Sequence, residues 1–140
     1  MALIIKQSYQ IDPQRVWKAI TDVNEMKVWY FDIIEFKPEE GFKFFFYGKG
    51  AKGEEYLHQC TVMESIENKL LSYSWCYDTI EGNTTVRFEL QQTGDRTLIT
   101  LTHKGLESFP KNNPDLSVDS FTQGWTYILG TALKDHLENK

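Results

Sequence analysis

The final segment of the chain, residues 117–139, has the pattern of one long amphipathic helix, and it follows a series of strand-like segments. Its apolar side chains recur mostly at intervals of three and four residues, which places them on one face of an α-helix. These residues are Val118, Phe121, Trp125, Ile128, Leu129, Ala132 and Leu133. A helix of this length spans roughly 35 Å, enough to lie across the whole sheet of a small domain. The sequence therefore predicts a sheet covered by a C-terminal helix.

The overall composition limits the classes of protein to which the chain can belong. With 140 residues, of which 41% are hydrophobic, we expect a single domain over residues 1–140 with a substantial core. The net charge of −5 argues against nucleic-acid binding. We expect neither a signal peptide nor a membrane span, because no segment approaches roughly 20 consecutive apolar residues. The two cysteines, Cys60 and Cys76, suit reduced thiols in a cytoplasmic protein.

Helix and strand signals divide the rest of the chain. Asp12 followed by Pro13 is typical of a helix N-cap and first turn, and Asp22 is expected to begin a second short helix. The predicted strands are residues 3–10, 33–37, 42–47, 56–65, 70–77, 84–92 and 96–103. We expect residues 33–47 to form a hairpin. The glycine-rich residues 48–53 are interpreted as a hairpin tip, because no helix follows them as it would in a phosphate-binding loop.

The cysteines provide a register prediction for the hairpin of residues 56–77. If this hairpin is symmetric about Asn68, Cys60 and Cys76 lie opposite each other, since each is eight residues from the centre. They would then be close without being bonded.

Three segments resemble a known family. They are residues 12–21 (DPQRVWKAIT), residues 70–75 (LLSYSW), and Gly124-Trp125 followed by Leu129, Leu133, Lys134 and Leu137. The chain is similar over its whole length to the START-like or Bet v 1-like superfamily (SRPBCC). Within it, the chain most resembles the family homologous to the C-terminal domain of the heat-shock protein 90 ATPase activator. The resemblance implies an α+β helix-grip fold. In that fold an antiparallel sheet of about six to seven strands wraps around a long C-terminal helix, and two short helices follow the first strand.

The resemblance implies fold more directly than function. Proteins of this superfamily often enclose an apolar cavity between sheet and helix, and they share no catalytic signature that could be transferred to this sequence. Complete activators contact the chaperone through an additional N-terminal domain, and we expect no counterpart of it in this chain. Gly124 borders the predicted apolar face, which indicates either close helix–sheet approach or room for a cavity. The pattern provides no explanation for Gly130.

Aromatic residues, 14% of the chain, concentrate in the segments that would enclose such a cavity. Periodicity does not distinguish a filled core from a lined cavity, so both interpretations remain open. The candidate ligand-binding residues are Trp17, Phe44, Phe46, Tyr73, Trp75, Phe88, His103, Phe121, Trp125, Ile128 and Leu129. Access would be through residues 48–53 or residues 105–116.

No residue pattern indicates a catalytic, metal or cofactor site. The three histidines, His58, His103 and His136, lack the spacing of a zinc site, and no nucleophile motif accompanies them. His103 and His136 both have the phase of inward-facing residues. Each is interpreted as a core histidine, a polar contact for a ligand or an acid–base group.

Three functional hypotheses follow. The first is non-catalytic binding of a hydrophobic small molecule or lipid-like ligand between the sheet and the C-terminal helix. The second is a chaperone-linked role in the stress response with heat-shock protein 90 as partner, which predicts a filled core and an exposed apolar patch. The third is a polyketide-type cyclase or hydrolase, which requires a polar pair inside the cavity, for example His103 with Tyr73.

Overall fold

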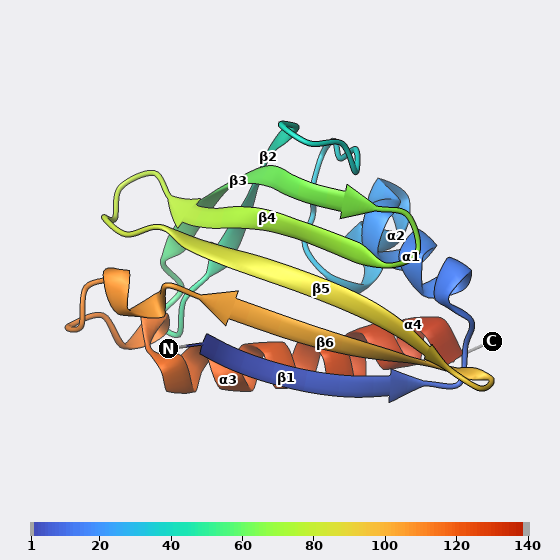
Figure 1. The fold of residues 1–140 in the computed structure, drawn as a ribbon. Helices are drawn as coiled ribbons and strands as arrows, with labels where there is room; N and C mark the ends of the chain where they lie inside the picture. Colours follow the sequence, from blue (N-terminus) through green and yellow to red (C-terminus); the bar gives the residue numbers. More distant parts are fainter. Residues whose placement is uncertain (1, 139–140) are drawn as a thin grey trace.

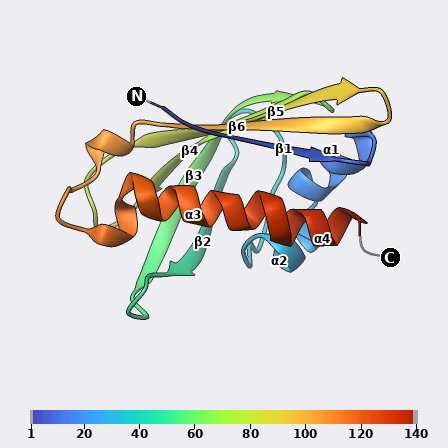
Figure 2. The same ribbon diagram turned by 90° about the horizontal axis from the view of Figure 1, so that it is seen from below.

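The computed structural model describes residues 2–138, which form an antiparallel sheet with a long helical segment across one face (Figures 1 and 2). The strands are β1 (Ala2–Tyr9), β2 (Lys43–Lys49), β3 (Glu55–Ile66), β4 (Leu70–Tyr77), β5 (Thr84–Thr93) and β6 (Arg96–Lys104). The helices are α1 (Pro13–Thr21), α2 (Val23–Trp29), α3 (Val118–Tyr127) and α4 (Leu133–Glu138). The strand order is β1-β6-β5-β4-β3-β2. The predicted helix-grip fold is confirmed, with six strands in the sheet.

The helices begin where their capping residues predict. Asp12, Asp22 and Ser117 accept backbone N–H bonds of 2.9, 2.8 and 3.1 Å in the first turns of α1, α2 and α3. Each bond satisfies a backbone donor that the helix itself leaves unpaired. These local signals fix the starts of α1, α2 and α3.

The C-terminal segment runs along the sheet as one helical rod with an internal irregularity (Figure 2). The π-helical turn Ile128–Ala132 connects α3 to α4. Tyr9, at the end of β1, donates a 2.7 Å hydrogen bond from its hydroxyl to the carbonyl oxygen of Leu129 in this turn. This buried bond ties the middle of the rod to the sheet, while α1 and α2 pack against α4 at one end (Figure 1).

The predicted strand at residues 33–37 is wrong. Residues 30–42 have no strand, and β2 pairs only with β3, so the predicted hairpin of residues 33–47 does not form. Ile33 and Phe36 enter the core, whereas Ile34 between them is 85% exposed. In a strand, side chains on the same face are two residues apart, whereas these two buried residues are three apart. Ile33 and Phe36 therefore anchor an irregular segment to the core.

The predicted cysteine alignment is also wrong. Gln59 is the residue that faces Cys76, because the register of β3 shifts between Val62 and Glu64. One extra residue on β3 shifts the pairing by one position, which moves the two cysteines to opposite faces of the sheet. Cys60 is buried and Cys76 is half-buried. Both thiols are free.

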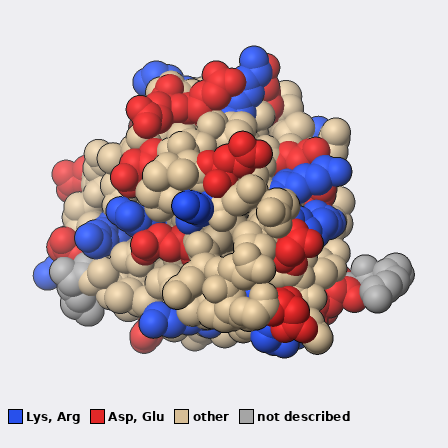
Figure 3. Space-filling view, turned by 45° about the vertical axis from the view of Figure 1, so that its right-hand side comes forward, with Lys and Arg blue, Asp and Glu red and all other residues tan. Residues whose placement is uncertain are grey.

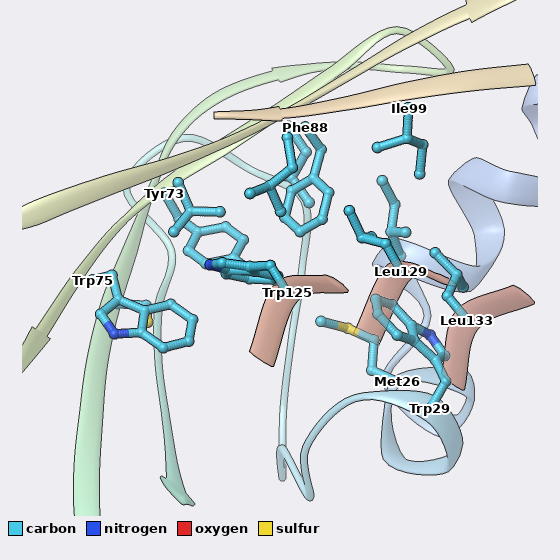
Figure 4. Packing of buried hydrophobic residues seen from close by; sticks show 14 of the residues in the cluster. Met26, Trp29, Tyr73, Trp75, Phe88, Ile99, Trp125, Leu129 and Leu133 are labelled. Atoms are coloured by element: carbon cyan, nitrogen blue, oxygen red, sulfur yellow. The ribbon is translucent and has the colours of Figure 1, made fainter. Parts of the chain in front are cut away.

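The core is a continuous layer of large side chains between the sheet and the C-terminal rod. Figure 4 shows Trp125 and Leu129 of the rod facing Phe88 of β5 and Tyr73 of β4, with Met26 of α2 closing one side. On the face shown in Figure 3, acidic and basic side chains are interspersed without a continuous basic patch. None of the helices within residues 2–138 is long and apolar enough to cross a membrane.

Candidate ligand pocket

A pocket of about 270 Å³ lies at the end of the sheet where β2, β3 and β4 approach α3. Its apolar lining comes from three parts of the chain that are distant in sequence. These residues are Phe31, Trp75, Leu116, Phe121, Trp125 and Ile128. Trp75 contacts both helix aromatics, with ring centroids 5.6 Å from Trp125 and 6.2 Å from Phe121. The pocket therefore has an aromatic side from the sheet and another from the helix.

The structure brings part of the predicted site together. Trp75, Phe121, Trp125 and Ile128 line this pocket. The other candidates are buried without lining it: Trp17, Phe44, Phe46, Tyr73, Phe88, His103 and Leu129. Four of the predicted residues therefore lie at the pocket, and the other seven belong to the packed core. Gly124 also lines the pocket, at an exposed position of α3, and a β-carbon added to it would meet nothing within 4 Å, so close helix–sheet approach does not explain this glycine.

Two polar side chains of the pocket, His58 and Tyr77, were not among the predicted site residues. His58 is 5% exposed and its Nδ1 atom lies 3.1 Å from the carbonyl oxygen of Tyr56. Burial lowers the pKa of His58 to about 4, although the backbone carbonyls of Tyr56 and Phe46 oppose this shift. The ring is therefore neutral at physiological pH. The alternation of β3 contains the missed signal, since His58 has the same strand phase as the buried Cys60.

Tyr77 is held beside this histidine by β4. Its hydroxyl accepts a 2.9 Å hydrogen bond from the indole N–H of Trp75, and its ring centroid lies 4.7 Å from that of His58. Burial raises the pKa of the Tyr77 hydroxyl above its ordinary value of 10.0. The two polar side chains beside Trp75, His58 and Tyr77, are therefore both uncharged at neutral pH.

Asp115 joins the two segments that were predicted to control access. Its carboxylate accepts a 2.7 Å bond from the Tyr56 hydroxyl and a 3.2 Å bond from the backbone N–H of Ala51. Gly50 is required for this approach, because a β-carbon there would collide with the Asp115 carboxylate. The β2–β3 hairpin tip and residues 105–116 thus meet beside the pocket through one side chain.

The polar pair predicted for an enzyme, His103 with Tyr73, does not form. His103 accepts a 3.1 Å bond at Nδ1 from the Trp125 indole N–H, and its Nε2 lies 2.9 Å from the Thr84 hydroxyl. Both ring nitrogens are thus paired, and burial lowers the pKa of His103 to about 3. Tyr73 instead bonds Tyr30, with 2.7 Å between the two hydroxyl oxygens. His103 points inward as predicted, and it fastens α3 to the sheet.

His136 does not face the cavity. Its Nε2 atom lies 2.8 Å from a carboxylate oxygen of Glu25, which also receives a 2.7 Å bond from Arg15. This cluster joins α4 to α1 and α2, at the other end of the molecule from the pocket. Among residues 2–138, no three His, Cys, Asp or Glu side chains come together as a metal site would require.

Comparisons with known proteins agree with this architecture. The sequence model of the family described as "Activator of Hsp90 ATPase homolog 1-like protein" matches residues 10–138. No curated protein matches the sequence.

Three similar solved structures are 16–21% identical to this chain, so they show the fold alone. MLL2253 from Mesorhizobium loti is 21% identical with a TM-score of 0.77, and the match covers 100% of this chain and 98% of that one. CV1439 from Chromobacterium violaceum is 16% identical with a TM-score of 0.84, covering 99% and 98%. DynU16, from the dynemicin biosynthetic locus, is 18% identical with a TM-score of 0.78, covering 99% and 47%.

Proposed function

Because the chain belongs to the activator of Hsp90 ATPase homolog 1-like family of the START-like superfamily, we propose that it binds a small hydrophobic molecule without converting it. The ligand is held between the sheet and α3. The observation that supports this proposal is the pocket of about 270 Å³ with aromatic residues on two sides. Ligand sites are typically concave and largely apolar, with few polar groups, and they begin at about 300 Å³. The expected ligand is therefore small.

Desolvation of the ligand against Trp75, Phe121 and Trp125 supplies most of the binding free energy. Each buried methylene contributes about 0.8 kcal/mol. The rings are held before binding, since the indole N–H groups of Trp75 and Trp125 are both hydrogen-bonded. A site that is already ordered loses less side-chain entropy on binding, which favours affinity for a small ligand.

The test is a thermal-shift and native mass-spectrometry screen with fatty acids, sterols, flavonoids and polyketide-like aromatics. A ligand at 100 times its Kd should stabilise the wild type by about 2.7 kcal/mol. The Gly124→Leu variant should lose this stabilisation, because Gly124 lines the pocket and a leucine side chain there has free space to extend across it.

Thr131→Leu is the matched control, because Thr131 is exposed on the same helical rod, as Gly124 is, but lies outside the pocket lining. It adds the same side chain to the same rod and should leave the ligand-induced shift unchanged. A panel without any stabilising ligand, or an equal shift in Gly124→Leu and wild type, would contradict ligand binding at this pocket.

A second candidate is a chaperone-linked role, as the family's name indicates. The observation that favours it is the exposure of two large apolar side chains, Val28 at 71% on α2 and Ile34 at 85% in the following segment. Contiguous exposed apolar surface is typical of sites that contact partner proteins. This candidate predicts stimulation of the Hsp90 ATPase by the purified protein and loss of stimulation in Val28→Ser/Ile34→Ser. An unchanged ATPase rate would argue against it.

A further inference from the structure

We propose that the pocket selects hydroxylated aromatic molecules, whose hydroxyl group donates a hydrogen bond to Nε2 of His58. This inference rests on the proposed function and specifies the chemical class of its ligand. It assigns to His58 the role of specificity-determining contact.

The tautomer of His58 follows from its neighbour. A backbone carbonyl oxygen only accepts hydrogen bonds, so the 3.1 Å contact with the Tyr56 carbonyl requires the hydrogen on Nδ1. In the neutral ring Nε2 is then an acceptor. Within residues 2–138, no hydrogen bond forms at this Nε2 atom, although the Phe46 carbonyl also lies near enough to the ring to raise its pKa. Every fully buried side-chain nitrogen and oxygen among these residues has a partner. Nε2 is therefore accessible from the pocket that His58 lines.

Gly48 leaves this edge of the imidazole uncovered. A β-carbon at position 48 would lie 2.8 Å from Cε1 of His58 and 3.5 Å from Nε2. Any other residue at this position would displace the ring or cover its acceptor. Gly48 and His58 belong to paired strands, so the opening is part of the sheet.

Neighbouring rings fix the direction of the acceptor. The His58 ring stacks on Phe46 with centroids 4.4 Å apart at 15°, and Trp75 meets it edge-on at 4.8 Å. Rotation of the imidazole would disrupt both contacts and the bond to Tyr56. A hydrogen bond to a preorganised group costs little conformational entropy, which increases its contribution to selectivity.

A neutral acceptor in a largely apolar pocket favours ligands that bring a donor and disfavours carboxylates. Burial keeps His58 neutral at pH 7, so it does not attract an anion. A ligand carboxylate would lose its hydration and face the lone pair of Nε2 without gaining a hydrogen bond, which costs free energy. The charged lining residues do not change this expectation, since Lys49 is exposed to solvent and the Asp115 carboxylate is already bonded by Tyr56. An aromatic ring that bears a hydroxyl group can pack against the aromatic side chains of the pocket and donate a hydrogen bond to Nε2.

The experiment is calorimetric titration with 2-naphthol, 2-methoxynaphthalene, naphthalene and 2-naphthoate. The methyl ether keeps the oxygen and removes the donor, so it isolates the proposed bond. We expect 2-naphthol to bind about fivefold more tightly than the ether, the ratio for a net hydrogen bond of about 1 kcal/mol. Naphthoate should bind more weakly than naphthalene.

Two variants and one spectrum assign the preference to His58. In His58→Phe the naphthol-to-ether ratio should fall to about one with naphthalene binding retained, whereas His136→Phe, at the far end of the molecule, should keep the wild-type ratio. The ¹⁵N shift of His58 Nε2 in the wild type should move on addition of 2-naphthol and stay unchanged with naphthalene. This measurement holds even if His58→Phe does not fold.

The outcomes separate this inference from the proposed function. Equal binding of 2-naphthol and its ether, or a preference that survives in folded His58→Phe, would overturn the role of His58 and leave the pocket as an apolar binding site. An unmoved Nε2 shift with bound naphthol would do the same. If neither naphthalene nor naphthol binds, aromatic binding in the pocket fails, and the hydroxyl selection fails with it.

Discussion

Replacing Gly124 with alanine should stabilise the protein. Glycine in a helix interior is about 1 kcal/mol less favourable than alanine, and Gly124 lies inside α3. The new β-carbon has no steric cost, since it would meet nothing within 4 Å. For a chain of this length, a gain of about 1 kcal/mol corresponds to an increase in Tm of about 3 °C.

Urea unfolding followed by far-UV circular dichroism measures the free energy of unfolding, and calorimetry measures Tm. Gly130→Ala is the matched comparison, because its β-carbon would lie 3.5 Å from the side-chain oxygen of Gln7 and the position is within the π-helical turn. It should stabilise less than Gly124→Ala. A folded Gly124→Ala protein that is less stable than the wild type would refute the free space around this β-carbon.

Three further predictions concern polar side chains. His58 and His103 have pKa values lowered from 6.5 to about 4 and about 3, so below pH 6.5 the unfolded chain binds more protons than the folded protein. The free energy of unfolding from urea titrations should therefore fall from pH 7 to pH 5, by about 2 kcal/mol per histidine, and a flat profile would contradict neutral burial. Tyr9→Phe should cost about 1–3 kcal/mol in the same assay, because it leaves the buried Leu129 carbonyl without this donor; no loss would mean that the bond is dispensable. Asp115→Ala should increase the rates of both association and dissociation of a pocket ligand, because it removes the hydrogen bonds that join the two access segments. Stopped-flow fluorescence measures both rates, and unchanged rates would rule out gating by these segments.

Local chemistry made much of the fold predictable from the sequence. Asp12, Asp22 and Ser117 cap helices through atoms within three residues, so their effect is visible without knowledge of the tertiary structure. The C-terminal helix was identifiable because one apolar stripe runs along its length. Its π-helical turn was not, because the bond from Tyr9 that supports Leu129 joins residues 120 positions apart.

The errors arise where tertiary packing overrides a local pattern. Ile33 and Phe36 have strand-like composition, but the core binds them as two separate anchors. The shift after Val62 moved the partner of Cys76 by one residue, and no turn signal in the sequence indicates it. Bulges depend on how the whole sheet curves over its covering helix, so a count from the turn residue cannot find them.

The position of the pocket was the least predictable feature. Tyr73 and Trp75 share one strand face and looked equivalent in the sequence, yet only Trp75 lines the pocket. Tyr73 packs against Phe44 and Phe88 of the sheet, whereas Trp75 packs against the α3 rings Phe121 and Trp125. Alternation along the strand does not encode this difference. His58 could have been included from its strand phase, whereas its tautomer required the position of the Tyr56 carbonyl.

The most direct test of the central claim is calorimetric titration of the most stabilising ligand from the panel into wild type, Gly124→Leu and Thr131→Leu. We predict one binding site in the wild type with a negative heat-capacity change, the mark of buried apolar surface. Affinity should be at least about tenfold lower in Gly124→Leu and unchanged in Thr131→Leu. Equal affinity in all three proteins would contradict a binding pocket between the sheet and α3.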